Sequence, residues 1–245
     1  MKSYYNLILF VLLIVFGFAL TNTAIAEIQT TVRFQPPPEE EQPKRTEGAA
    51  SRQTTQCAVD SLMPQSNAGD RFNLASIVPQ QNYGLTTLER PDLWIYLPKT
   101  SAKQAILSIR EEGNIPHWQQ SVELTERAGV TGIRLADDAP ILKLGKNYQW
   151  AVILICCDRP NPNDPVVTSW IKRVAPKNIK TPSTSKLELA STYAQQGIWY
   201  DALNILISEK SSQENWCNLW SEYLESAGLD KIADKPVIEN LLFSE

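Results

Sequence analysis

The sequence predicts a mostly β protein with α-helices at its C-terminal end: an antiparallel β-sandwich over residues 57–176 and a helical segment over residues 183–245. Two observations carry this prediction. From Leu74 onward, short apolar or alternating segments recur with turn sequences between them. Beyond Pro182 the spacing of apolar residues changes to the period of an α-helix.

The β region contains about seven expected strands. Turn-forming residues such as Gly113-Asn114 and the proline-rich run 158–164 separate them. Regular short strands at this spacing are typical of a sandwich rather than of βαβ units. The expected strands lie near residues 85–88, 93–97, 105–110, 117–124, 130–135, 147–157 and 166–174.

The residues around Tyr148 resemble the turn and strand of an immunoglobulin-like, fibronectin-type module. A glycine turn at Gly145 precedes the tyrosine, whose hydroxyl would bond back to the main chain as a tyrosine corner. The strand that follows is apolar on both faces, whereas a half-solvated strand alternates apolar and polar residues. We therefore expect the helical segment to cover its second face.

Three helices are expected beyond Pro182, at about 186–196, 198–209 and 212–227, with a short fourth through 241–243. The glycine that follows the first helix, Gly197, is a typical C-terminal signal. The first two helices resemble one tetratricopeptide repeat. The matching residues are Leu189, Ala190, Tyr193, Gly197, Trp199, Tyr200 and Ala202. Because stable arrays need about three repeats, we expect a hairpin packed on the sandwich, not a peptide-binding groove.

The N-terminus carries the features of a cleaved secretory signal. Lys2 supplies the positive charge, Leu7–Leu20 is an uncharged apolar run, and Ala24 and Ala26 form a small-residue cleavage site. The apolar run is shorter than the about 20 residues that a membrane span requires. We therefore expect residues 1–26 to be removed, leaving a periplasmic or extracellular protein without a membrane span.

A proline-rich tether is expected over residues 27–56. The stretch 35–56 contains no large apolar side chain and carries Pro36, Pro37 and Pro38. Nothing in it offsets the entropy of ordering the backbone. We interpret it as a disordered spacer, although proline-rich segments can also be ligands.

Four cysteines remain in the predicted mature chain. In an oxidising compartment an even number suggests disulfide bonds, and the spacing fits no zinc pattern with His117 as the single histidine. We favour a bridge between Cys57 and Cys156. Cys157 and Cys217 then either form a second bridge or are buried thiols.

The charge excludes several classes of partner. The formal net charge is -4, and no basic stripe or block is present to bind a nucleic acid or an anionic membrane. No nucleotide-binding, zinc-protease or nucleophile-elbow motif occurs, and we expect neither a cofactor nor a metal site. His117 reads as a surface histidine, and the oxygen-rich loop 158–164 as a turn rather than a calcium site.

The strongest hint of binding is aromatic. If alternate residues of the strand 93–97 face the core, Trp94 and Tyr96 face outward, and Trp118 lies on a neighbouring strand. Exposed Trp and Tyr can stack on sugars or anchor a protein. The alternative is that these side chains lie beneath the helical segment.

The chain resembles an exported cyanobacterial family catalogued as domain of unknown function 928. The resemblance covers about residue 57 to the end and implies compartment and architecture but no activity. It rests on the following segments: Leu85-Thr86, Glu89-Arg90-Pro91, Leu93–Pro98, Tyr148-Gln149-Trp150, Ile155-Cys156, Trp170–Val174 and Gly197–Leu203.

These observations together predict a non-catalytic envelope protein that acts as a protein-interaction or scaffold module. The alternative is a module that binds envelope glycan through exposed aromatic side chains. An uncharacterised hydrolase ranks third, because no pair of nucleophile and base is visible. The partner, protein or glycan, is not identified by the sequence.

Overall fold

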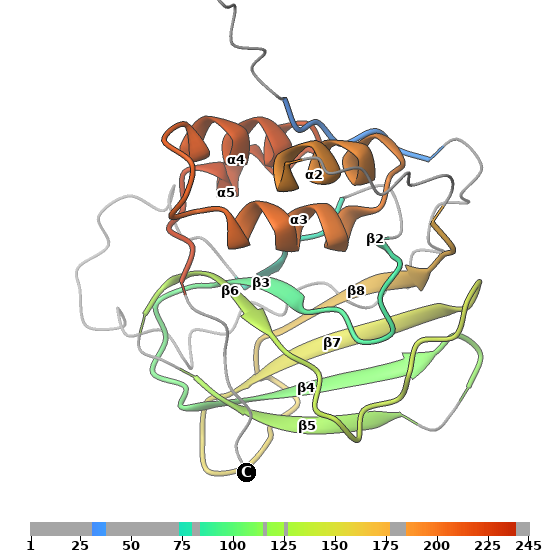
Figure 1. Cartoon of the computed structure of the whole chain (residues 1–245). Coiled ribbons are helices and arrows are strands. Elements are labelled where there is room, and N and C mark those ends of the chain that lie inside the picture. Colours follow the sequence, from blue (N-terminus) through green and yellow to red (C-terminus); the bar gives the residue numbers. More distant parts are fainter. Residues whose placement is uncertain are drawn as a thin grey trace, which may run out of the picture. The chain divides into compact units, whose positions relative to one another are not determined.

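Figure 1 shows a computed structural model of the chain, in which residues 31–37, 74–79, 84–114, 117–124, 127–176 and 185–238 are described. All of them belong to one compact unit, Thr31–Glu245. Three predictions fall outside the described residues: the signal peptide at 1–26, most of the tether and the short fourth helix at 241–243.

The β region forms two sheets, in agreement with the predicted mostly β class. The larger sheet has the order β2-β8-β7-β4-β5 and the smaller one β1-β3-β6. Neighbouring strands are antiparallel, except that β2 runs parallel to β8. The strands are β1 Ala75–Ser76, β2 Gly84–Thr86, β3 Leu93–Leu97, β4 Gln104–Glu111, β5 Trp118–Glu123, β6 Gly129–Ile133, β7 Asn147–Ile155 and β8 Val166–Arg173.

Seven of these strands match the predicted positions within a few residues, because each has an apolar pattern bounded by turn residues. The strand β1 was not predicted. It contains two residues only and pairs with β3 through Ala75 opposite Tyr96 and Ser76 opposite Ile95. Apolar alternation cannot reveal an element of that length.

One face of β7 faces the core and the other is half-buried. Trp150 is fully buried, and its indole N–H donates a hydrogen bond to the hydroxyl of Tyr200 in the helical segment, at 2.9 Å. Ile153 and Ile155 on the opposite face are half-buried. The helices therefore contact the Trp150 face, and the prediction that they cover the second face of this strand is wrong. The bond to Tyr200 also gives the buried indole N–H of Trp150 the acceptor that a buried donor needs.

The predicted tyrosine corner is present. The hydroxyl of Tyr148 accepts a hydrogen bond from the backbone N–H of Lys143, at 3.1 Å. Gly145 lies between them with φ +73°, in the left-handed region that favours glycine. The turn and the strand thus hold each other in place.

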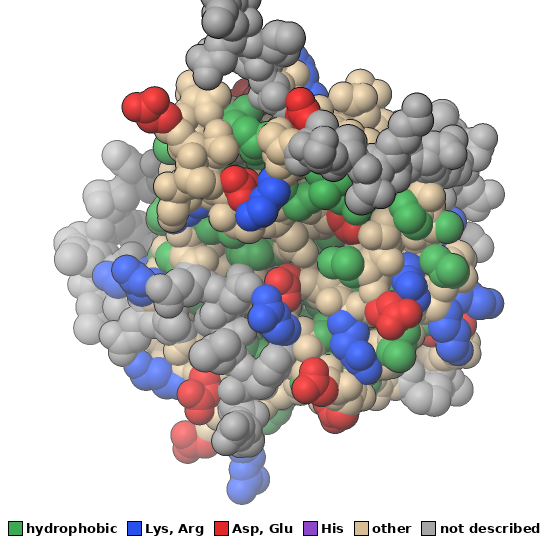
Figure 2. All heavy atoms as spheres, in the orientation of Figure 1, with side chains coloured by type: hydrophobic (Ala, Val, Ile, Leu, Met, Phe, Trp, Pro, Cys, Tyr) green, Lys and Arg blue, Asp and Glu red, His purple; other side chains and the backbone are tan. Residues whose placement is uncertain are grey.

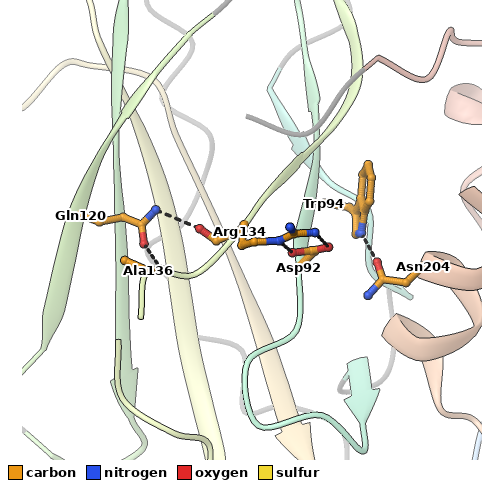
Figure 3. A network of polar contacts seen from close by, with 6 residues as sticks. All are labelled: Asp92, Trp94, Gln120, Arg134, Ala136 and Asn204. Atoms are coloured by element: carbon orange, nitrogen blue, oxygen red, sulfur yellow. Dashed lines mark hydrogen bonds and ion pairs between the residues drawn. The ribbon is translucent and has the colours of Figure 1, made fainter. Parts of the chain in front are cut away.

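Polar contacts join the two sheets, and a bond from Trp94 to Asn204 joins β3 to α3 (Figure 3). Gln120 of β5 donates to the carbonyl of Arg134 and accepts from the backbone N–H of Ala136, both just beyond β6. The guanidinium of Arg134 forms a bidentate salt bridge with the carboxylate of Asp92, with N–O distances of 3.0 and 3.2 Å. These bonds fix the edges at which the sheets meet.

The helical segment contains α2 Lys186–Gln195, α3 Trp199–Ser208, α4 Trp216–Glu225 and α5 Asp230–Ala233. The hydroxyl of Ser185 caps α2 by accepting from the N–H of Glu188. Gly197 ends the first helix with φ +73°, as predicted. In Figure 1, α3 lies between the sheets and the pair α2 and α4. None of the helices in the described part of the chain combines the length and the apolar character that a membrane crossing needs.

Candidate interaction surface

Residues 31–37, here called the arm, lie in an extended conformation across the helical segment (blue in Figure 1). Burial alternates along the arm. Val32 is 0% exposed and Phe34 5% exposed, whereas Thr31, Arg33 and Gln35 face solvent. This alternation is what a single extended strand shows when one of its faces lies on a surface.

The backbone of the arm bonds to both outer helices. The N–H of Phe34 donates to the hydroxyl oxygen of Ser226, just after α4, at 2.8 Å. The N–H of Gln35 donates to the carbonyl of Ala194 near the end of α2, at 3.0 Å. Carbonyls in the last turn of a helix lack partners within it. The arm therefore shares the carbonyl of Ala194 with the N–H of Gly197, which bonds to the same oxygen at 3.1 Å.

Two further contacts lie at the start of the arm. The hydroxyl of Ser191 in α2 donates to the carbonyl of Thr31 at 2.9 Å. The guanidinium of Arg33 lies 3.7 Å from the carboxylate of Glu222 in α4. The arm thus runs in the same direction as α2 and contacts α4 from its other side.

Trp199 forms the floor beneath the arm. Its ring meets that of Phe34 edge to face, with centroids 5.2 Å apart, and stacks on Tyr223 at 4.5 Å. Its indole N–H donates to the carbonyl of Ile77 at 2.7 Å. We call the surface made by α2, α4 and Trp199 the arm groove.

Gly197 is needed for the arm as well as for the end of α2. A Cβ at this position would lie 2.6 Å from Cδ of Pro37 and 3.1 Å from the carbonyl oxygen of Gln35. Real Cβ atoms do not approach other atoms so closely, and φ is already +73°. Any larger residue would push the arm away from the helices.

The prediction of a disordered tether over 27–56 is therefore wrong for residues 31–37. The argument from composition covers residues 35–56, where no large apolar side chain occurs. Val32 and Phe34 precede that stretch, and both are buried. Their alternation was the signal in the sequence that could have found the arm.

The predicted hairpin is packed on the sheets by two residues that follow Trp199. The hydroxyl of Tyr200 accepts from Trp150, and its ring lies against β2, where a Cβ on Gly84 would approach Cε2 of the ring to 2.3 Å. Burial raises the pKa of Tyr200 far above its ordinary value. This phenol is a neutral structural group.

Asp201 fastens the start of α3 to the end of β2. Its carboxylate accepts from the hydroxyls of Thr86 and Thr87 and from the backbone N–H of Thr87. Burial raises the pKa of Asp201 above its ordinary value, and the hydrogen bonds from Thr87 and Thr86 lower it part of the way back. The native state then binds this proton more readily than the unfolded chain does, so its contribution to stability falls as the pH rises above about 4.

The predicted aromatic face is not at the surface. Trp94 is 2% exposed and Tyr96 8% exposed. The indole N–H of Trp94 donates to the side-chain oxygen of Asn204 in α3 at 2.6 Å (Figure 3). Trp118 is half-buried against the core. The outward-facing interpretation of Trp94 and Tyr96 is therefore wrong, and the alternative of burial beneath the helical segment is confirmed. Trp94 bonds to α3, and Tyr96 lies near Lys235 and Asp234, just beyond α5.

The remaining candidates for chemistry stay apart. His117 is exposed. A hollow of about 660 Å³ is lined by described residues that include Glu123, Cys157 and Asp158 but not His117. The described residues form no group of three or more His, Cys, Asp or Glu side chains suited to a metal ion. In the loop 158–164, one oxygen of Asp164 accepts from the backbone N–H of Asn161, as in a turn.

The cysteines separate into two kinds. Cys157 and Cys217 are free and exposed thiols. The prediction that these two form a second bridge or are buried is therefore wrong. Cys156 is not among the free thiols, and Cys57 lies outside the described residues. The favoured bridge between Cys57 and Cys156 stays a prediction.

Charged side chains of both signs are interspersed on the face shown in Figure 2.

A protein-family model described as Domain of Unknown Function (DUF928) matches residues 47–237. No curated protein matches the chain, and no solved structure does.

Proposed function

Because the chain belongs to the family described as Domain of Unknown Function (DUF928), a description that carries no activity, we propose a function from the arm groove itself. The protein acts as an exported, non-catalytic protein-interaction module of the cell envelope. Its two sheets form a β-sandwich of the immunoglobulin or fibronectin type, and its helices a hairpin like a tetratricopeptide repeat.

One observation supports this proposal above the others: the helices hold an extended peptide segment. The arm buries alternate apolar side chains and bonds its backbone to α2 and to the end of α4. Main-chain hydrogen bonds and pockets for alternate side chains are the contacts by which extended peptides are recognised at sheet edges, and the arm makes contacts of both kinds with helices. The glycan alternative has no comparable support, because Trp94 and Tyr96 are buried.

The export signal at residues 1–26 supports a periplasmic or extracellular location. An oxidising compartment favours a bridge between Cys57 and Cys156, since Cys157 and Cys217 are free. Titration of thiols in the folded mature protein should therefore give two reactive groups, with two more after reduction of the unfolded chain. Four reactive groups without reduction would rule out the bridge.

Affinity capture from the cell envelope with tagged mature protein tests the interaction role. We expect specific recovery of a protein partner. The variant Glu222→Lys changes the charge beside the arm, and Glu123→Lys makes the same change on β5, far along the chain from the groove. Recovery of a partner of the arm groove should decrease with the first variant and stay unchanged with the second. Recovery of peptidoglycan or polysaccharide alone, or of soluble monomer only, would contradict the proposal.

A further inference from the structure

The arm is held by the contacts of a ligand rather than by those of a secondary structure element. It makes no strand pairing: its backbone bonds to the hydroxyls of Ser226 and Ser191 and to the carbonyl of Ala194. Two apolar side chains, Val32 and Phe34, supply the buried surface. The hydrogen bonds of the arm and the ring contact of Phe34 are all with the helical segment.

The way the arm is joined to the chain permits its release. Residues 38–73 connect it to the first described residue of the β region, Leu74. An extended chain spans about 3.3–3.6 Å per residue, so the length of this connection alone does not hold the arm in the groove. Ordering of the arm's backbone opposes docking, so the two buried side chains leave a small net preference for the docked state.

The arm groove also has a charge preference. Arg33 of the arm lies against Glu222 of α4. Glu188 of α2 lies one helical turn before Ser191, which contacts the arm. A peptide with a basic residue between its apolar residues therefore suits this surface better than an acidic peptide.

We propose that the arm is an exchangeable ligand of its own chain, which a partner protein displaces with an extended segment of the same pattern. That segment has an apolar residue, a basic residue and an aromatic residue in succession, with proline three positions after the aromatic residue. The fit is set by the pocket of Phe34 on Trp199, by the acceptor at Ala194 and by Glu222. Pro37 against Gly197 selects for a chain that stays extended. This inference rests on the proposed function and specifies the chemistry of the partner.

Exchange can be measured on a chain that folds with its own arm in place. A site for a specific protease is inserted between residues 40 and 50 of the mature protein, and the folded protein is then cut. The cut chain keeps the arm bound without a covalent link. A fluorescein-labelled peptide of residues 30–38 is added, and its anisotropy is followed with time.

We expect a saturable rise in anisotropy in the cut protein, and a much weaker rise in the uncut protein because the tethered arm competes. An excess of unlabelled peptide should reverse the rise. A peptide with Phe34→Asp should not bind. Glu222→Lys should weaken binding by about two- to fivefold, and a peptide with Arg33→Glu should recover that loss on the variant.

Three results would overturn the inference. The cut chain could keep its arm permanently and take up no labelled peptide. It could lose its helical circular dichroism when the arm leaves, which would make the arm an inseparable part of the fold. The uncut protein could form dimers that the free peptide dissolves, which would identify a second copy as the occupant. Failure of the envelope capture with successful exchange would reject the envelope role alone.

Discussion

Replacing Phe34 by alanine tests whether the arm docks as a unit. Phe34 is 5% exposed, and its ring packs edge to face with the ring of Trp199, with the two ring centroids 5.2 Å apart. The substitution removes this contact and leaves the backbone bonds of the arm chemically intact. The neighbouring change Val32→Ala affects the second buried side chain, which is 0% exposed.

The size of the effect has an upper limit set by the structure. Burying a Phe side chain contributes about 1.5–3 kcal/mol, and an edge-to-face aromatic pair adds about 0.5–1.5 kcal/mol. The direct loss in Phe34→Ala is therefore about 2–4.5 kcal/mol. Ordering each residue of the arm costs about 1–2 kcal/mol, so the arm does not remain docked after this loss. The free energy of unfolding should then decrease by the docking energy of the arm and no further.

A double-mutant cycle measures this limit. Urea unfolding should show that Val32→Ala destabilises the wild-type chain but changes the Phe34→Ala variant by less than about 0.5 kcal/mol. Val122 of β5 is also 0% exposed and lies far along the chain from the arm. Val122→Ala is the matched control, and it should cost the same in both backgrounds. Quenching of tryptophan fluorescence by acrylamide should increase in Phe34→Ala, because Trp199 loses its cover.

Full additivity of Val32→Ala and Phe34→Ala would refute the reasoning. It would mean that the arm stays docked when its aromatic anchor is gone. Loss of helical circular dichroism in Phe34→Ala would refute it in the other direction, since the helices would then depend on the arm for their folding.

Three further predictions concern the contacts that hold the helices and turns. Asp201→Asn removes a group whose pKa is raised by burial. The stability of this variant relative to wild type should therefore increase as the pH rises from about 4 towards neutral. Urea unfolding across that pH range checks the sign, and a flat or falling difference in stability would contradict the prediction. Tyr148→Phe removes the acceptor for the N–H of Lys143 and should cost about 1 kcal/mol in the same assay, with an unchanged midpoint counting against a role for the corner. Trp94→Phe leaves the side-chain oxygen of Asn204 without its donor and should cost about 1–3 kcal/mol, unless Asn204→Ala is introduced with it.

Periodicity predicts most of the fold because it reports burial. β7 alternates buried and half-buried residues along its whole length, and β4 alternates buried residues with half-buried or exposed ones as far as Arg110; the positions of both were found from the sequence. Trp216, Leu219, Trp220 and Tyr223 line the buried face of α4, although α4 begins at Trp216 and not at Ser212. Local pattern states that a face is buried and leaves open what buries it.

The candidate site depends on that second question, and this is why much of it was missed. The pattern of β3 leaves open whether Trp94 and Tyr96 face solvent or lie beneath the helices, and every residue of β3 is buried. The side of the sheet that the helices cover is a property of the tertiary arrangement. Asp201 had no signal beyond its place in the resemblance to the family, since an acidic residue in the first turn of a helix is common on the surface.

Three consecutive residues at the start of α3 explain how the arm groove is related to the rest of the molecule. Successive residues of a helix point about 100° apart, so Trp199, Tyr200 and Asp201 face three different neighbours. Trp199 lies under the arm, Tyr200 bonds to Trp150 in the larger sheet, and Asp201 holds the end of β2. A change in the position of α3 therefore moves the floor of the groove together with its anchors on the sheet. The groove is therefore fastened to the sheets through α3, and the exchange that we propose displaces the arm alone.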